Sequence, residues 1–497
     1  MKTLLLDPID TVEVILETAD QRFLPGAKVA RVAMSKGSEI VKLGVTIGIA
    51  AKDIAVGELV DHQVMQELEE PRIARNDPRL PQISGFPQLP EYFRYFDGYL
   101  NSDGSAGTRN YLCISTSVHC VSAVSEHAVK VIRRDLLPKY ENVDGVVLLN
   151  HTYGCGVAIN ARDACIPKRT LSNLMLNPNF GGYALLIGLG CEKLRHEMMV
   201  PASPQHGQQV SFQFDSLYIQ SVEEAGFAAI INAICEKAEA ALERLNSRRR
   251  QRLPISKLVV GMQCGGSDAF SGISANPMLG VMSDLLISAG GSSMFSENTE
   301  CMDAESYLVT RCVNYETGRK LQEEFKWYRQ YLARGGADRT ANTTPGNKAG
   351  GLSSISEKAL GSIAKAGRAD IVDVIPPGER LNLPGLNYLS GPASDFICGT
   401  LQLAAGANMH IFTTGRGTPY SIDGFPVLKV STTTHLFTHW RDIIDFDAGR
   451  VLSGQDLNQC ALEFFEMLVK TASGKPTAAE KLGLSNDLVL FNPGPIT

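Results

Sequence analysis

Apolar runs that end in a glycine-rich or polar turn recur four times between residues 111 and 268, and each turn carries a cysteine. The cysteines are Cys120, Cys155, Cys191 and Cys264. The first three cysteines follow one another at intervals of ~35 residues, and the fourth follows after about twice that interval. An interval of ~35 residues is the length of a βα unit with its loops. The pattern predicts strands of parallel sheets whose carboxyl ends each present a thiol. Open α/β sheets bind their ligands at that edge.

The first 70 residues show a different pattern of apolar and polar positions. Within residues 1–70, short apolar runs alternate with glycine turns, which predicts a small β-rich module. Its expected strands cover 12–16, 27–34, 39–43 and 45–50. Prolines then recur between residues 71 and 90 and exclude a regular helix, so 71–94 is interpreted as an extended linker.

Strand and helix patterns alternate from residue 95 onward, which predicts two α/β domains with mainly parallel sheets, 95–252 and 253–497. The fold class is therefore α/β, with a small N-terminal β module and a proline-rich linker. Expected helices of the first α/β domain cover 124–137, 162–176 and 223–249, and the stretch between residue 192 and the last helix has no regular pattern. Expected elements of the second are strands 257–264, 292–297, 369–375, 409–415 and 425–432 and helices 277–290 and 304–335.

Composition narrows the functional class. The 497 residues carry a net charge of −6 and show no long basic stripe, which argues against a nucleic-acid-binding protein. One basic cluster, 248–252, closes a predicted helix, where cations favour the helix dipole. No secretory signal and no apolar run of about 18 residues is present, so we expect a cytosolic protein without membrane association. Because the cytosol keeps thiols reduced, we expect the eleven cysteines to be free thiols, metal ligands or catalytic groups.

The cysteine turns suggest a metal centre. Thiolates and imidazoles suit zinc, iron or an iron–sulfur cluster, and the candidate ligands are Cys155, Cys191, Cys264 and His151. A single buried cysteine is more often a small hydrophobic residue, so the argument depends on their recurrence at strand ends. The acid/base candidates beside the thiols are His119, Glu192 and Asp268. A nucleophilic Cys120 or Cys155 paired with a histidine is an alternative.

Further motifs suggest an anionic ligand. A turn containing Gly265, Gly266 and Ser267 leads into a predicted helix, an arrangement that binds anions through free N–H groups. Lys348 lies in a glycine loop, where it can hold a carboxylate or act as a base, and Lys358 follows on a predicted helix. Arg416, between two glycines after a strand, can grip a carboxylate bidentately. Together with a metal ion, this set suits removal of water from a sugar acid.

Long motifs in a fixed order also resemble the altronate/galactarate dehydratase family, over about residues 95–497. They include DGSAGTRNYL (103–112), TSVHC (116–120), NHTYGCGVAINA (150–161), GLGCEKL (188–194), MQCGGSDAFSGISANP (262–277), PGNKAGGL (345–352), EKALGSIAK (357–365) and TTGRGTPY (413–420). TSVHC and NPNFGG (177–182) are similar to the galactarate branch, whereas PGLNYLS (384–390) is closer to the altronate branch. Sulfolactate sulfo-lyase has a similar large subunit.

The resemblance implies a β-clip, SAF-like N-terminal module and an Fe(II)-dependent conversion of D-galactarate into 5-dehydro-4-deoxy-D-glucarate and water. Another divalent metal or a labile iron–sulfur cluster is an alternative cofactor, and altronate or sulfolactate an alternative substrate. We also expect a homodimer. The N-terminal part departs from the family, because a Gly-His-Lys stretch reads Gly26-Ala27-Lys28 and a paired-histidine stretch reads GELVDHQVM (57–65). A sugar-acid-binding protein without catalysis is therefore an alternative of another class.

Overall fold

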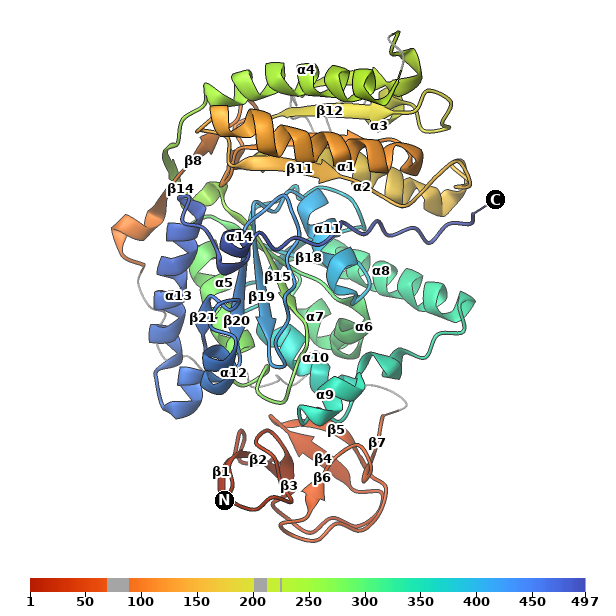
Figure 1. The fold of residues 1–497 in the computed structure, drawn as a ribbon. Helices are drawn as coiled ribbons and strands as arrows, with labels where there is room; N and C mark the ends of the chain where they lie inside the picture. The colour runs from red at the N-terminus through yellow and green to blue at the C-terminus, as the bar shows by residue number, and fades with distance from the viewer. Residues whose placement is uncertain (69–88, 201–211, 224–225, 497) are drawn as a thin grey trace.

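The computed structural model describes residues 1–68, 89–200, 212–223 and 226–496. Three parts follow one another along its length, with the N-terminal module at one end, the second α/β domain in the middle and the first α/β domain at the other end (Figure 1). Most of the predicted linker lies outside the described residues. No helix of the described residues is long and apolar enough to cross a membrane.

The N-terminal module is built from short antiparallel strands, as predicted. They form two sheets, of order β1-β2-β3-β6 and β4-β5-β7. The four predicted strands correspond to β2, β3, β4 and β5, while β1, β6 and β7 were not predicted. Their bounds are β1 Lys2–Leu4, β2 Val12–Glu17, β3 Lys28–Ala30, β4 Glu39–Lys42, β5 Val45–Ala50, β6 Leu59–Val60 and β7 Met65–Gln66.

The first α/β domain contains the three predicted cysteine-tipped strands side by side in a parallel sheet of order β11-β10-β12-β13. Its strands are β10 Tyr111–Thr116, β11 Gly145–Leu149, β12 Tyr183–Gly188 and β13 Gln213–Tyr218, and its helices are α1 Ser122–Val131, α2 Cys165–Met175, α3 His196–Met199 and α4 Phe227–Asn246. Strand β13 was missed, because this edge strand has no buried residue and lacks an apolar run.

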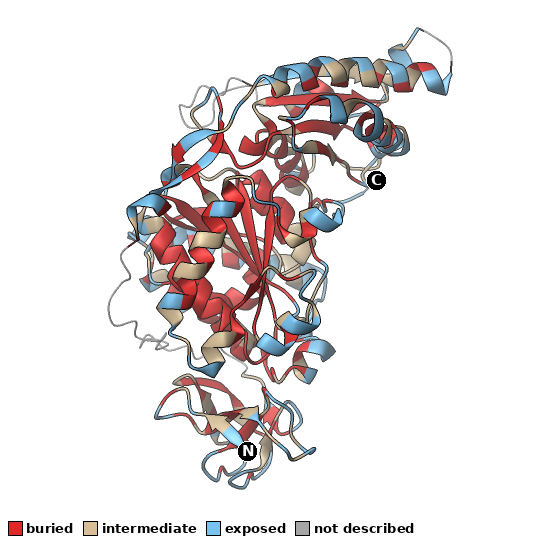
Figure 2. Cartoon of the chain, turned by 60° about the vertical axis from the view of Figure 1, so that its left-hand side comes forward, coloured by how far each residue is buried: buried red, intermediate tan, exposed pale blue. Residues whose placement is uncertain are grey.

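The second α/β domain has a seven-stranded sheet of order β17-β18-β16-β15-β19-β20-β21, in which every adjacent pair is parallel. Its strands are β15 Val259–Cys264, β16 Ser292–Phe295, β17 Ile371–Ile375, β18 Leu386–Leu389, β19 Met409–Thr414, β20 Val427–Ser431 and β21 Phe446–Asp447. Strands β18 and β21 were not predicted. The sheet is buried on both faces (Figure 2), as wholly parallel sheets are.

Helices cover both faces of this sheet (Figure 1). They are α5 Ala275–Ser288, α6 Asn298–Cys301, α7 Glu305–Thr310, α8 Tyr315–Arg334, α9 Pro345–Ala349, α10 Ile355–Ala364, α11 Asp395–Ala404, α12 Thr434–His439, α13 Leu457–Ala472 and α14 Ala478–Leu482. The prediction of one helix over 304–335 was wrong, because the chain leaves the helix after α7. Asn314 then caps α8 by accepting a hydrogen bond from the Thr317 N–H.

Both parallel sheets reverse their strand order once. The first sheet reverses between β10 and β12, and the second between β15 and β19. The carboxyl ends of these strand pairs flank the crevices where doubly wound sheets bind ligands. The topology therefore creates two candidate sites in two different domains.

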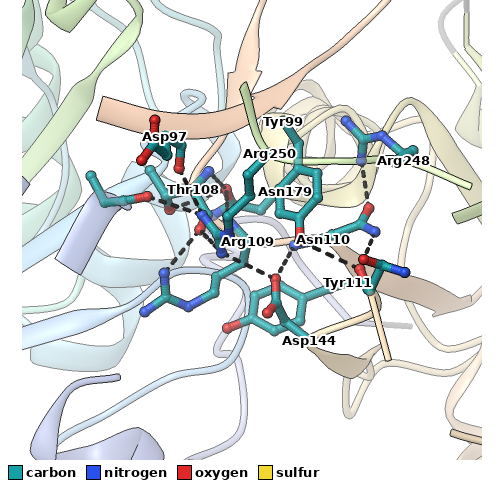
Figure 3. A network of polar contacts seen from close by, with 12 residues as sticks. Asp97, Tyr99, Thr108, Arg109, Asn110, Tyr111, Asp144, Asn179, Arg248 and Arg250 are labelled. Carbon is teal, nitrogen blue, oxygen red and sulfur yellow. Dashed lines mark hydrogen bonds and ion pairs between the residues drawn. The ribbon is translucent and has the colours of Figure 1, made fainter. Parts of the chain in front are cut away.

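An arginine-rich network fastens the first α/β domain to its neighbour (Figure 3). Arg109 donates to Glu480 of the second domain at 2.7 and 2.9 Å. Arg250 donates to the Ala472 carbonyl oxygen of the second domain at 3.3 Å and, within its own domain, to the carbonyl oxygens of Asp97 and Thr108. Arg250 also lies over the ring of Tyr99, 4.7 Å from its centroid. The basic cluster 248–252 thus joins elements of the fold, beyond the helix-dipole role predicted for it.

Candidate active site

The structure divides the predicted site residues between the two sheets. His119, His151, Cys155, Cys191 and Glu192 follow strands of the first α/β domain. The others lie in the second α/β domain, and they are Cys264, Gly265, Gly266, Ser267, Asp268, Lys348, Lys358 and Arg416. Sequence spacing predicted a thiol at each strand end, and the strand before Cys264 was predicted in the second domain, where the structure places it in the other sheet.

In the first domain, the polar residues mainly hold the loops together. Glu192 accepts hydrogen bonds from Ser117 Oγ at 2.5 Å and from the N–H groups of Leu189 and Gly190. Burial alone would raise the pKa of Glu192, but these hydrogen bonds outweigh it and lower the pKa. A carboxylate stabilised in this way is a weak base.

The two histidines of this domain are also engaged. His151 is buried, its Nε2 lies 3.1 Å from the carbonyl oxygen of Thr116, and its Nδ1 accepts the Tyr153 N–H. Burial lowers the pKa of His151 to about 4, so its ring is neutral near pH 7. His119 is exposed, and its Nδ1 lies 3.0 Å from the His151 carbonyl oxygen. A pocket beside these loops has mostly apolar walls.

The predicted metal ligands are not assembled into one site. Cys155 and Cys191 are exposed in the first domain, whereas Cys264 is buried at the end of β15 in the second. Within residues 1–68, 89–200, 212–223 and 226–496, no group of three or more His, Cys, Asp or Glu side chains could hold a metal ion. The set Cys155, Cys191, Cys264 and His151 therefore does not fit an iron ion or cluster in this arrangement.

At the second reversal point, Asp268 is the central acidic residue. It is buried, and its carboxylate accepts hydrogen bonds from Thr432 Oγ1 at 3.0 Å, Ser271 Oγ at 3.1 Å and the Phe270 N–H at 3.1 Å. Burial raises the pKa of Asp268 to about 6, although these hydrogen bonds act in the opposite direction. A carboxyl group that titrates close to neutral pH is suited to general acid/base catalysis.

Glycines allow the loops around Asp268 to approach one another. A Cβ atom at Gly415 would lie 2.1 Å from the Asp268 Cγ, and one at Gly350 would lie 3.0 Å from the Asp268 Cβ and 3.2 Å from the Arg416 Cδ. The Gly350 carbonyl oxygen also accepts the Ala269 N–H. The motifs QCGGSD, PGNKAGG and TTGRG, distant in sequence, thus meet at one point.

Arg416 and Lys348 are the predicted carboxylate clamps. Arg416 is exposed, and among the described residues no carboxylate forms a salt bridge with its guanidinium, whereas the Lys348 ammonium acts electrostatically on the carboxyl group of Glu67. Two N–H groups in and beside the Gly265–Gly266 turn are already engaged, since Gly265 donates to the Thr413 carbonyl and Asp268 to Ser271 Oγ. The exposed Arg416 guanidinium is therefore a cationic group that can receive an anion at this point of the site.

Three acidic residues that follow β16 were missed, and each pairs with a cation of the site. Lys358 Nζ lies 2.8 Å from Glu300 Oε1, and the contacts Lys365–Glu297 and Arg339–Asp303 are also close ion pairs. The signal was present in the sequence, because acidic residues follow a predicted strand in SENTECMDAE (296–305) as the cysteines follow theirs.

The N-terminal module adds charged residues that the sequence could not place. Lys28 and Lys42 both contact the buried carboxylate of Glu357, at 3.0 and 2.6 Å. Although burial opposes it, the two ammonium groups lower the pKa of Glu357 to about 2. A small pocket is lined by Lys42, Glu357, Lys358 and Asp268 among others, so the module forms part of its wall.

Three family models match the chain in succession. "Altronate/galactarate dehydratase SAF domain" matches residues 7–68, "D-galactarate dehydratase/Altronate hydrolase, second domain" matches 98–246, and "D-galactarate/Altronate dehydratase, C-terminal" matches 255–496.

Similar curated proteins span nearly the whole chain. Galactarate dehydratase (L-threo-forming) of Escherichia coli is 48% identical over 95% of this chain and 90% of its own length. Altronate dehydratase of Bacillus subtilis is 35% identical over 94% of this chain and 91% of its own length. The (2R)-sulfolactate sulfo-lyase subunit beta of Chromohalobacter salexigens is 29% identical over 78% of this chain and 95% of its own length.

Proposed function

The chain belongs to the galactarate/altronate dehydratase family of hydro-lyases, and we propose that it removes water from D-galactarate to give 5-dehydro-4-deoxy-D-glucarate. The observation that carries this proposal is the meeting of Asp268 with Arg416 beside Gly350 and Gly415. This places an acid/base group next to an unpaired guanidinium, at the edge of the sheet where ligands of α/β proteins bind.

In the proposed mechanism, Asp268 takes the proton next to the substrate carboxylate. A pKa of about 6 leaves this carboxyl group mostly ionised at neutral pH, and its burial makes it more basic than an exposed aspartate. The hydroxyl group on the neighbouring carbon then leaves as water once it has received a proton. Asp268 can return the proton that it has taken, so both transfers can use one carboxyl group.

Cationic side chains stabilise the negative charge that develops on the substrate carboxylate during proton removal. Arg416 offers a guanidinium without a carboxylate partner, and Lys358 offers an ammonium at the edge of the cavity that Asp268 also lines. Electrostatic attraction to Glu300 keeps the pKa of Lys358 raised in spite of burial. Lys358 thus remains charged during turnover.

Two cationic regions near Asp268 favour a substrate with two carboxylates. Lys42 and Lys358 line the cavity that Asp268 also lines, and Arg416 lies beside Gly350, which itself adjoins Asp268. Galactarate has a carboxylate at each end, while altronate has one. The sequence identity of 48% to a galactarate dehydratase, against 35% to an altronate dehydratase, supports the same choice.

A requirement for Fe(II) stays a prediction from the sequence. The predicted ligands are not gathered in this structure, so no step of the mechanism above depends on a metal. Activity measured after chelation and again after anaerobic addition of Fe(II) tests the requirement. A cytosolic location and a homodimer also stay predictions, and size-exclusion chromatography with light scattering tests the second.

The proposed function is tested by incubating the protein with galactarate, glucarate, altronate and sulfolactate under anaerobic conditions with Fe(II), and following formation of a 2-keto acid. We expect the highest kcat/KM with galactarate. Higher activity with altronate would exclude galactarate as the preferred substrate. A rise in melting temperature with galactarate, without turnover of any compound, would favour a binding protein without catalysis.

A further inference from the structure

Two short rows of charged residues face each other at the edge of the proposed active site. Glu297 and Glu300 lie three residues apart at the start of α6, and Lys358, Ser362 and Lys365 follow one face of α10 at helical spacing. Lys358 pairs with Glu300, and Lys365 pairs with Glu297. We call this set the α6–α10 ladder.

The ladder is removed from solvent. Its side chains are between 0 and 11% exposed, and of its members Lys358 and Ser362 line the cavity whereas Glu297, Glu300 and Lys365 do not. Buried ion pairs are weak evidence for stability, since desolvation can exceed the attraction between the charges. Two such pairs side by side therefore require another explanation.

The Lys358–Glu300 pair determines where the Lys358 ammonium lies. Glu300 Oε1 accepts from Lys358 at 2.8 Å, while Ser362 Oγ donates to Glu300 Oε2 and so holds the carboxylate from behind. Asn342 Oδ1 accepts from Lys358 at 2.7 Å. The third N–H of the ammonium has only a longer contact, 3.3 Å, with the Asn342 carbonyl oxygen. It is the N–H available to an oxygen atom of a ligand in the cavity.

The Lys365–Glu297 pair contacts the end of the neighbouring strand β15. Glu297 has a left-handed backbone with φ of 82°, which a residue other than glycine rarely adopts. Its Oε1 accepts the Cys264 N–H at 3.4 Å while the carboxylate pairs with Lys365. Strained backbone of this kind is concentrated at functional sites, where the surrounding structure maintains it.

We propose that Glu300, supported by Ser362, is a positioning residue that directs the Lys358 ammonium toward a substrate carboxylate. This inference rests on the proposed function, in which Lys358 contacts the substrate. Glu300 itself does not line the cavity beside Asp268 and acts through Lys358. A structural role alone would not link the effect of Glu300 to the presence of the lysine.

The test is a double-mutant cycle in the full-length protein, with kcat and KM for galactarate and the melting temperature as readouts. E300Q keeps the shape of the side chain but removes the charge that holds Lys358. We expect kcat/KM to fall by on the order of 100-fold, the scale of a misplaced substrate contact. S362A should cause a smaller loss in the same parameter.

The decisive variant is E300Q/K358M. If Glu300 acts through Lys358, E300Q will cause no further loss of kcat/KM in the K358M background. Multiplicative losses in the double mutant would overturn the proposal, as would an unchanged kcat/KM in E300Q. E466Q is the matched control, because it removes an exposed pair with Lys470 at 2.6 Å, and it should leave all readouts unchanged.

The double mutant also separates this inference from the proposed function. Absence of galactarate turnover in the unmodified protein would refute the proposed function itself. Turnover in the unmodified protein together with multiplicative losses of kcat/KM in the double mutant would refute only the positioning role. Formation of a 2-keto acid from galactarate, with no further loss of kcat/KM when E300Q is added to K358M, supports both the proposed function and the positioning role.

Discussion

Replacement of Asp268 with asparagine separates the catalytic role of this residue from its contribution to stability. The amide has the shape of the carboxyl group, and its oxygen can still accept from Ser271 Oγ and the Phe270 N–H. The Thr432 hydroxyl, which donates to the carboxylate at 3.0 Å, can turn and accept from the new NH₂ group instead. The variant should therefore fold and lose only the titratable charge.

The size of the stability effect follows from the pKa. Burial raises the pKa of Asp268 from an ordinary value of 3.8 to about 6, so the folded protein binds one proton more than the unfolded chain between these two pH values. Stability consequently falls as the pH rises through this interval. A difference of about 2 pKa units corresponds to ~3 kcal/mol. The asparagine variant has no carboxyl group at this position, so this part of the pH-dependent fall in stability is absent from it. Between pH 4 and pH 7, the stability of the variant relative to that of the unmodified protein should therefore rise by up to ~3 kcal/mol.

Thermal unfolding of both proteins across this pH range measures the difference, and the kcat/KM profile for galactarate measures the chemistry. We expect unfolding curves that diverge as pH rises, and a loss of activity in D268N of at least ~100-fold, the lower range for a general base. The kcat/KM of the unmodified protein should rise through about pH 6. Parallel pH dependence of the two melting temperatures, or an active D268N, would refute the assignment.

Three further changes test the surroundings of Asp268. R416K keeps the charge but loses the bidentate grip, so KM for galactarate should rise about 10-fold or more, and an unchanged KM in steady-state kinetics would argue against the clamp. G415A places a methyl group 2.1 Å from the Asp268 Cγ and should abolish activity with little loss of secondary structure by circular dichroism, whereas G335A, which meets only ordinary contacts, should remain active. E357Q leaves two buried ammonium groups without their anion and should destabilise the docked N-terminal module by ~3–5 kcal/mol, measured by denaturant unfolding; an effect as small as that of the exposed E58Q would contradict this.

The sequence by itself determined the fold class and most elements that position the site. Short apolar runs between glycine turns located the strands of the N-terminal module, and continuous apolar runs located β10, β11, β12 and β15, because buried parallel strands admit few polar residues. Where such a signal was absent the prediction failed. Strand β13 has a mixed, partly exposed sequence, and the interruption between α7 and α8 contains no proline or glycine.

The candidate site was predicted in part. Asp268 and Arg416 were selected because polar residues in glycine turns after strands have a recognisable local pattern, and Lys358 was selected on the predicted helix that follows the glycine loop of Lys348. The partners Glu300 and Glu357 were not selected, since a charged residue on a short helix is usually solvated. Their importance comes from burial and from cations that lie far away in sequence.

Only the tertiary structure decided which strand ends meet. The rhythm of about 35 residues is the same in both domains, because it reflects the length of a βα unit and carries no information on which sheet a strand joins. Strand order separates Cys264 from Cys155 and Cys191 and instead places its turn beside the Arg416 loop. Contacts across hundreds of residues, such as that between Lys28 and Glu357, depend on packing between domains, which no local pattern encodes.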